Sequence, residues 1–288
     1  MVLGDKMVSV KEFKSIDLAS FTIVSTGIVV LFAIIISIAA AIGLLILSAG
    51  DIGTLIYIIP TIIVGAFMIG IYRYFTDGLF FNLVSNKLKN IKVSLTGGEL
   101  LKISPIETAT IAATVATIQI VLVYLASILI LPLMLSTLVQ SLMLAGQQLI
   151  AYELYQLMFL ITQPTTALMF IIGTFVITFV FMLIAVYIYN LLASNGRGIV
   201  FELSQENGMT VIDSISMMNF AINIAIIGGA LSLIIGIISL ISGGDVISLI
   251  SNVISGIISG FISAALIAIF YNFLAPKIGK IKLELIDA

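Results

Sequence analysis

Long apolar blocks alternate with short polar segments along the whole chain. Charged residues are absent over stretches long enough for a transmembrane helix, which needs about 20 apolar residues to cross the hydrocarbon core. The pattern predicts six spans, near 20–47, 54–84, 106–135, 165–193, 216–241 and 246–274. The composition agrees, because only 9% of the 288 residues are charged, against about 25% in soluble domains. We therefore expect an all-α polytopic membrane protein.

The positive charges predict how these spans are oriented. Of the 12 Lys and Arg residues, all but Arg73 lie in the N-terminal segment, the second connection, the fourth connection or the C-terminal tail. The other three connections carry only acidic residues, which are Asp51, Glu153 and Asp245. By the positive-inside rule, this places both termini in the cytoplasm and predicts a multi-pass protein of the cell membrane. The first span is expected to stay in the chain as a helix and not to be a cleaved signal peptide.

Three segments align without gaps and indicate an internal repeat. They are FFNLVSNKLKNIKVSL (80–95), IYNLLASNGRGIVFEL (188–203) and FYNFLAPKIGKIKLEL (270–285), and each follows a second span. Similar heads, SIDLAS, KISPIE and VIDSIS, precede the first spans. The chain is predicted to be three two-span repeats, 9–95, 101–203 and 209–285, in parallel orientation. Three such units predict a pseudo-threefold arrangement.

Short segments between the spans have the period of β-strands. Six of them mix β-branched and polar residues with period 2, namely 8–16, 91–95, 99–103, 199–203, 209–212 and 281–286. TGG (96–98) and SQENG (204–208) are turn signals between them. The cytoplasmic strands are therefore expected to form a small six-stranded sheet or to close into a barrel, which would remove exposed edges.

The repeated motif resembles a known family. The sequence A-x-x-Y-N, a Gly-containing turn and then I-x-x-E-L is similar to the DUF3566 family, a two-span transmembrane domain of unknown function. IAIFYNFLAPKIGKIKLEL (267–285) is the closest copy and AVYIYNLLASNGRGIVFEL (185–203) the next. The first copy departs, because Phe81 replaces the tyrosine. The resemblance implies a topology for each repeat and no particular activity.

The residues that are missing exclude several classes of function. The chain has no histidine and no cysteine, so haem, iron–sulfur and ordinary zinc sites are not expected. Nucleophilic sites built on Ser-His or Cys-His are impossible. The sequence predicts no cofactor and no metal, and a protein that is not an enzyme.

Three asparagines occupy one column of the repeat. Asn82, Asn190 and Asn272 lie near the ends of the second, fourth and sixth spans. The favoured interpretation is that each amide satisfies backbone groups at the helix end or in the following loop. The alternative is a polar ring around the threefold axis that coordinates a solute or an ion.

Small residues recur at steps of four in the even spans. Gly70 lies in the second span, and Gly256 and Gly260, followed by Ala264, lie in the sixth. Small residues let helix backbones approach closely in lipid, so helix packing is the expected role. A serine-lined pore is the alternative, because Ser255, Ser259 and Ser263 flank these positions.

Two polar pairs stand out within the spans. Arg73 and Asp77 are four residues apart and can pair on one helix face, either as an interfacial anchor or as a functional asymmetry of the first repeat. Asn219 and Asn223 are also four apart, and either bond across helices or face a polar cavity.

The heads of the three repeats each carry one acid before the first span, namely Asp17, Glu107 and Asp213. The favoured role is to cap the helix N-terminus. A cation site is the alternative, if the three heads converge.

The second repeat is longer than the others on the outer side. The surplus lies near 135–160, where Gln140, Gln147, Gln148, Tyr152 and Gln156 recur at helical spacing among apolar residues. This predicts an amphipathic helix that lies in the interface or extends the third span, and that ends before Pro164.

These features favour a non-catalytic membrane scaffold or assembly module. A small channel or transporter with a path along the threefold axis is the alternative, and an intramembrane enzyme is the weakest. The lipid bilayer is the predicted partner, a further membrane or cytoplasmic protein is left open, and no nucleic acid is expected.

Overall fold

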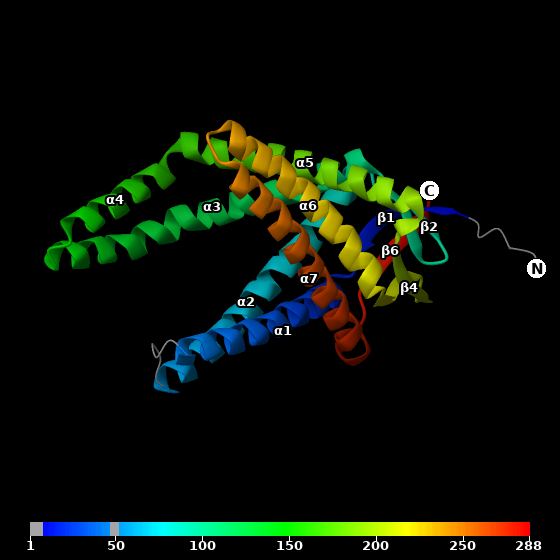
Figure 1. Ribbon diagram of the computed structural model, residues 1–288, viewed down its shortest axis with the longest axis horizontal. Coiled ribbons are helices and arrows are strands. Elements are labelled where there is room, and N and C mark those ends of the chain that lie inside the picture. Colours follow the sequence, from blue (N-terminus) through cyan, green and yellow to red (C-terminus); the bar gives the residue numbers. More distant parts are fainter. Residues whose placement is uncertain (1–7, 47–51) are drawn as a thin grey trace, which may run out of the picture. The chain divides into compact units, whose positions relative to one another are not determined.

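The computed structural model describes residues 8–46 and 52–288. Strands and helices follow in the order strand, helix, helix, strand three times, with two extra helical segments in the middle (Figure 1). The helices are α1 (Leu18–Ile46), α2 (Ile52–Ser85), α3 (Pro105–Leu144), α4 (Gln148–Thr162), α5 (Pro164–Leu192), the π-helical η1 (Ala193–Arg197), α6 (Met217–Ile241) and α7 (Val246–Ile278).

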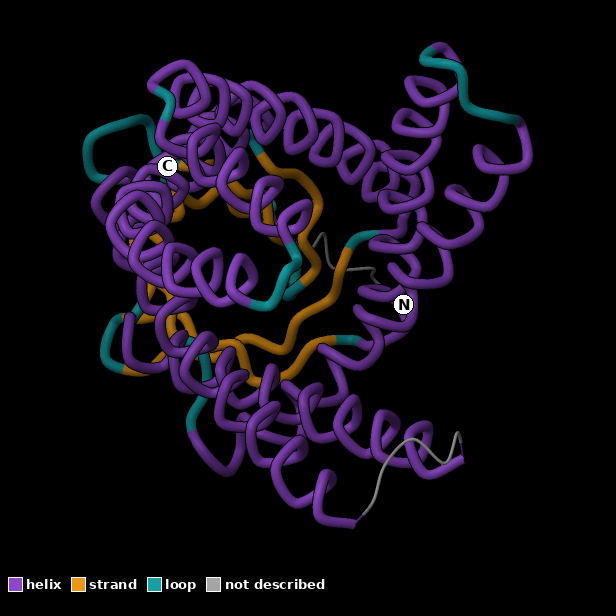
Figure 2. Tube along the Cα trace, turned by 90° about the vertical axis from the view of Figure 1, so that its left-hand side faces the viewer, coloured by secondary structure: helices purple, strands orange, loops and turns teal. Residues whose placement is uncertain are grey.

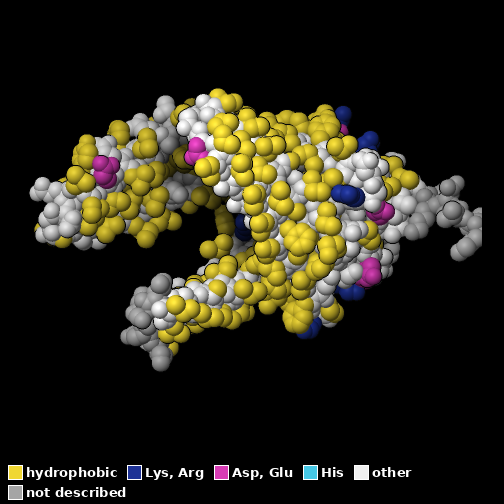
Figure 3. All heavy atoms as spheres, in the orientation of Figure 1, with side chains coloured by type: hydrophobic (Ala, Val, Ile, Leu, Met, Phe, Trp, Pro, Cys, Tyr) yellow, Lys and Arg dark blue, Asp and Glu magenta, His cyan; other side chains and the backbone are white. Residues whose placement is uncertain are grey.

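Six of these helices are long and apolar enough to cross a membrane. They are α1, α2, α3, α5, α6 and α7, and they match the six predicted spans. Large apolar side chains remain exposed along all of them, as the side chains in Figure 3 show for one face. A soluble protein rarely exposes so much contiguous apolar surface, so these helices are consistent with an integral membrane protein.

The six strands form one closed barrel. They are β1 (Ser9–Ile16), β2 (Ile91–Thr96), β3 (Glu99–Ile103), β4 (Ile199–Glu206), β5 (Met209–Ile215) and β6 (Lys282–Asp287). Neighbours in sequence are neighbours in the barrel, and antiparallel pairing of β1 with β6 closes it. Figure 2 shows the strands as a ring from which the helices depart. Of the two forms left open, a sheet or a barrel, the structure shows the barrel, which leaves no strand edge unpaired.

Two tight turns join the hairpins of the barrel. Gly97 and Gly98 have φ values of 56° and 86°, and Asn207 and Gly208 have φ values of 52° and 81°. Two central residues with positive φ are characteristic of the type I′ turns that suit two-residue hairpins. The predicted SQENG loop was too long, because its first three residues continue β4 and only Asn207 and Gly208 make the turn.

The structure divides into two compact units, which are described separately. The first comprises the chain up to Thr108 together with Leu183–Ala288, and the second comprises Ala109–Met182. The first unit holds the barrel and the helix pairs α1–α2 and α6–α7. One apolar core joins α1 to α7 through Val24, Ile28, Tyr271 and Ala275, and Ile212 and Ile215 of β5 pack against it.

The second unit holds most of α3 and α5, with α4 between them. The prediction that the third span ends near 135 was wrong, because α3 continues to Leu144 through Pro132. The amphipathic segment is helical as predicted, partly as this extension and partly as α4, which ends at Thr162. Pro164 starts α5, a position where proline costs no hydrogen bond. The hydroxyl of Tyr124 donates to the carbonyl of Ile161 at 2.5 Å.

Candidate functional site

The three equivalent asparagines make the same pair of hydrogen bonds. In each, Oδ1 accepts from the backbone N–H of a strand residue, and Nδ2 donates to the carbonyl of that same residue. The pairs are Asn82 with Ile16 (2.8 and 2.8 Å), Asn190 with Ile103 (2.8 and 2.8 Å) and Asn272 with Ile215 (2.9 and 2.9 Å). These bond pairs tie α2 to the end of β1, α5 to the end of β3 and α7 to the end of β5. The partner is thus the end of an earlier strand, whereas the expected partners were backbone groups at the helix end or in the following loop.

A tyrosine next to the asparagine bridges two strands in two of the three places. Tyr189 donates to the carbonyl of Leu100 in β3 at 2.5 Å and accepts from the N–H of Ile199 in β4 at 3.2 Å. Tyr271 donates to the carbonyl of Ile212 in β5 at 2.5 Å and accepts from the N–H of Ile281, the residue before β6, at 3.3 Å. A phenol can both donate and accept, so each hydroxyl takes the place of a bond between two strands.

Between β1 and β2 the residue next to the asparagine is Phe81, which has no hydroxyl. Phe81 packs on Phe13 of β1, with ring centroids 4.7 Å apart. Phe13 pairs directly with Ile91 of β2, within a ladder that runs through five residue pairs from Ser9. The corresponding ladders, β3 with β4 and β5 with β6, register only two pairs each. The sequence difference at Phe81 therefore coincides with a longer ladder.

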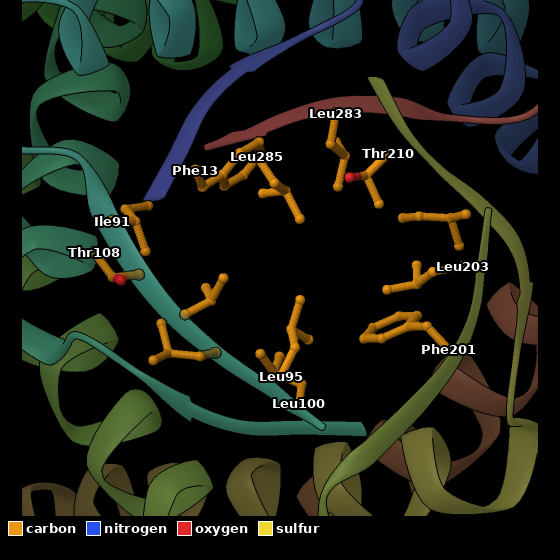
Figure 4. A pocket seen from close by; sticks show the side chains of 13 residues that line it. Phe13, Ile91, Leu95, Leu100, Thr108, Phe201, Leu203, Thr210, Leu283 and Leu285 are labelled. Atoms are coloured by element: carbon orange, nitrogen blue, oxygen red, sulfur yellow. The ribbon is translucent and has the colours of Figure 1, made fainter. Parts of the chain in front are cut away.

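The barrel encloses an apolar lumen (Figure 4). It has a volume of about 280 Å³ and an entirely apolar surface. We use "the lumen" for the space lined by Phe13, Ile91, Val93, Leu95, Leu100, Ile103, Thr108, Phe201, Leu203, Thr210, Ile212, Leu283 and Leu285. Apart from Thr108 of α3, the labelled side chains in Figure 4 come from the six strands and point inward. This follows from strand periodicity, because alternate residues face the interior of a barrel.

The two threonines of the lumen do not make it polar. The hydroxyl of Thr108, in the first turn of α3, donates to the carbonyl of Ser104 at 2.7 Å. The hydroxyl of Thr210 accepts from the amide of Gln205 at 2.9 Å. Both hydroxyls are engaged with neighbours outside the lumen surface.

The volume of the lumen is large for a small barrel. Protein interiors are close-packed and rarely contain voids much larger than a water molecule. A closed apolar void destabilises a protein in proportion to its volume. The lumen has a volume of about 280 Å³ and is open over part of its surface. Water is a poor filler, because it needs two to four polar partners in a buried site.

The outer face of the barrel carries ion pairs. Lys14 lies 2.9 Å from Glu284, Lys280 lies 2.6 Å from Asp213, and Lys92 lies 3.5 Å from Glu12. A hydrogen bond from Ser15, and then one from Lys14, hold the pKa of Glu284 below its ordinary value. Hydrogen bonds lower the pKa of Asp213 chiefly through Lys280, and that of Glu12 chiefly through Asn90. The barrel is thus apolar inside and charged outside.

The small residues of the even spans pack against a neighbouring helix. A Cβ on Gly260 would lie 3.0 Å from the carbonyl oxygen of Ile224, and one on Gly256 would collide with Ser232, both in α6. A Cβ on Gly70 would lie 3.0 Å from Thr26 of α1. These contacts agree with the expected packing role.

Arg73 and Asp77 form the expected pair on α2. Arg73 Nε lies 3.8 Å from Asp77 Oδ2, and the arginine side chain is largely exposed. The guanidinium also lies 6.0 Å from the ring centroid of Tyr74. The pair thus lies on the surface of α2, and Asp77 is the more buried of its two side chains.

Asn219 and Asn223 lie beside the turn formed by η1. Asn223 Nδ2 donates to the carbonyls of Arg197 and Asn219, at 2.7 and 2.8 Å, while its buried Oδ1 has no partner among the described residues. Asn219, Asn223, Gly196, Arg197 and Ile222 line a second cavity, of about 290 Å³. Asn223 thus bonds to the η1 turn, and both asparagines border this cavity.

The three acids at the repeat heads do not form a shared centre. Asp17 accepts from the N–H of Ser20 at 2.8 Å and so caps α1, as predicted. Asp213 belongs to β5 and pairs with Lys280, and Glu107 lies in the first turn of α3. Among the described residues, no three acidic side chains come together in a way that could hold a metal ion. Asp51 lies outside the described residues.

Sequence reasoning missed the lumen and the tyrosine bridges. The signal for the bridges was present, since Tyr189 and Tyr271 share the column beside the asparagine. The signal for the lumen was the strand alternation, which placed Leu, Ile and Phe on one face of every strand.

Comparisons with family models, with curated proteins and with solved structures gave no match for this chain. The resemblance to DUF3566 therefore stays a prediction from the motif.

Proposed function

We propose that this chain is a non-catalytic membrane module in which a barrel gathers three helix pairs into one assembly. The paired hydrogen bonds of Asn82, Asn190 and Asn272 carry this proposal. In each asparagine, both polar atoms of the amide form hydrogen bonds with backbone groups at a strand end. Residues used in this way hold a framework together and leave little capacity for a ligand.

The proposal includes the arrangement of the module. The repeated order of strand, helix, helix and strand supports three equivalent units, 9–95, 101–203 and 209–285, related by a pseudo-threefold axis along the membrane normal. The Lys and Arg distribution supports a cytoplasmic barrel and cytoplasmic termini. Each unit then corresponds to one DUF3566-like domain, and the module presents its charged barrel surface to a cytoplasmic or membrane partner.

Removing one asparagine amide tests the framework role. In Asn190→Ala the N–H and the carbonyl of Ile103 lose their partner, and each unsatisfied buried group costs about 1–3 kcal/mol. We expect a clearly lower melting temperature in lipid nanodiscs. The matched control is Asn195→Ala, because Asn195 is exposed and bonds only within its own turn in the described structure. Equal melting temperatures for the two variants would contradict the framework role.

A channel is the second candidate, and the lumen is the observation that favours it. Channels can be gated by hydrophobic constrictions that exclude water, and a lumen lined by Leu, Ile and Phe has that character. A polar residue in such a gate would hydrate it, so Leu203→Asn should then cause an ion leak in liposomes. The matched variant Glu202→Asn, which changes the outward-facing neighbour, should cause no leak. A scaffold predicts no leak in either variant, and a leak confined to Leu203→Asn would replace our proposal with the channel.

A further inference from the structure

We propose that the lumen binds one unbranched alkyl chain, contributed by a single-chain amphiphile such as a medium-chain fatty acid. The inference does not rest on the scaffold role. It starts from the chemistry of the lining, whose surface offers only carbon to an occupant. A ligand held there can gain free energy from burial of apolar area but not from hydrogen bonds.

The shape of the lumen selects the kind of apolar ligand. The space is bounded on all sides by the six strands of a closed barrel, so a diacyl lipid could insert only one of its two tails. Its volume of about 280 Å³, at roughly 30 Å³ for a group the size of water, holds about nine methylene groups. One chain of medium length therefore fits without expanding the barrel.

The position of the lumen gives such a chain a route. Leu18, Pro105 and Met217 start α1, α3 and α6 directly after β1, β3 and β5. All of these helices consequently leave the same end of the barrel. Thr108, in the first turn of α3, belongs to the lining at that end. Helices α1 and α6 are long and apolar enough to cross a membrane. An amphiphile in that membrane can thus pass its tail into the lumen and keep its polar head outside.

A tryptophan placed in the lumen tests the proposal. The natural chain has no tryptophan, so Phe201→Trp gives a single fluorophore inside the lumen. Glu202→Trp gives the matched fluorophore on the outward-facing neighbour. The full chain is purified in a steroid-based detergent, whose rigid apolar part is too wide for the barrel, and reconstituted in phosphatidylcholine nanodiscs. The probe is decanoic acid brominated at the end of its tail.

We expect saturable quenching of Phe201→Trp at one probe per chain, and only weak, non-saturable quenching of Glu202→Trp. Bromodecanol and a brominated lysophosphatidylcholine should also quench if the alkyl chain alone is recognised. Adding Val93→Phe to Phe201→Trp fills the lumen and should reduce the quenching at least several-fold. Ser94→Phe, which points outward from the same strand, should leave it unchanged.

Three results would overturn the proposal. The first is equal quenching of the two tryptophans, and the second is quenching that Val93→Phe does not reduce. The third is quenching only by nanodisc lipids brominated in their acyl tails, which would assign the lumen to a diacyl lipid. Melting curves of each variant confirm that the barrel is folded, and bound decanoic acid should raise the melting temperature of the natural chain but not that of Val93→Phe alone.

Discussion

The hydroxyl groups of two tyrosines decide how three otherwise similar places in the barrel are built. Tyr189 and Tyr271 insert a hydroxyl between two strands, whereas Phe81 leaves β1 and β2 to pair directly. A buried carbonyl without a partner is costly. The ladder between two strands can therefore be short only where a side chain completes its hydrogen bonds.

Tyr189→Phe is the test at the residue scale. The change removes one hydroxyl and leaves the carbonyl of Leu100 and the N–H of Ile199 without that partner, so we expect a loss of about 1–3 kcal/mol and a lower melting temperature. Tyr187→Phe is the control, because Tyr187 lies on the same helix and is 55% exposed. An unchanged melting temperature for Tyr189→Phe would mean that β3 and β4 pair directly once the hydroxyl is gone.

At the scale of elements, helices α6 and α7 approach closely because glycines line their contact. Gly260→Leu should push the two backbones apart, since its side chain would meet the backbone of Ile224 and Ala225. Overpacking of this kind costs about 1–3 kcal/mol or more. Gly260→Ala should be milder, and Ser259→Leu, at an exposed position, should be tolerated. The melting temperature of each variant is measured together with solute flux in liposomes. Lost flux with an unchanged melting temperature in Gly260→Leu would mean that this helix face lines a transport path and does not pack against α6.

The carboxylates of the barrel allow its stability to be tested through the pH dependence of the melting temperature. The pKa values of Glu12, Asp213 and Glu284 are all lowered in the folded protein. A lowered folded-state pKa contributes stability above the unfolded pKa, and this contribution is lost as the pH falls through the folded value. The melting temperature should therefore decrease on acidification below about pH 5.

A lysine variant assigns this pH dependence to the ion pairs. Lys280→Met removes the side chain that lowers the pKa of Asp213 most. The decrease in melting temperature between neutral and acidic pH should become smaller in this variant. Lys89→Met, in the connection between α2 and β2, is the control. An unchanged pH profile in Lys280→Met would assign the effect to other groups.

At the scale of the whole molecule, the closure of the barrel within one chain is the main finding. β1 and β6 come from opposite ends of the sequence, yet Phe13 pairs with Leu285 and Lys11 forms an ion pair with Asp287 at 2.6 Å. A single chain can thus complete the barrel without a second copy. We propose that the chain consists of three two-span units that each supply two strands, which is what fusion of a trimeric ancestor would leave.

The membrane topology is the prediction for the whole molecule. Since positive charges flank one side of every span, reporters fused after Thr96, Glu206 and Ala288 should be cytoplasmic, and those after Asp51, Glu153 and Asp245 external. Activity of paired alkaline phosphatase and fluorescent protein fusions measures this. One reversed connection would refute the six-span topology that we propose.

The sequence by itself determined the spans and the strands, because both depend on local patterns. A segment in lipid must be apolar over its whole length, and a strand with one buried face must alternate. The equivalence of Asn82, Asn190 and Asn272 was also visible, because it needed only an alignment. The end of α3 could not be predicted from the sequence, because Pro132 is compatible with both a helix end and a helix interior.

Only the tertiary structure decided what these pieces do together. The partner of each asparagine lies 57 to 87 positions away in sequence, so no local pattern could name it. Closure of the barrel depends on β6 meeting β1, which is set by the register of every intervening strand pair. The volume of the lumen depends on how far inward thirteen side chains reach across a closed ring. Such a volume is a property of three-dimensional packing, and no linear pattern of residues contains it.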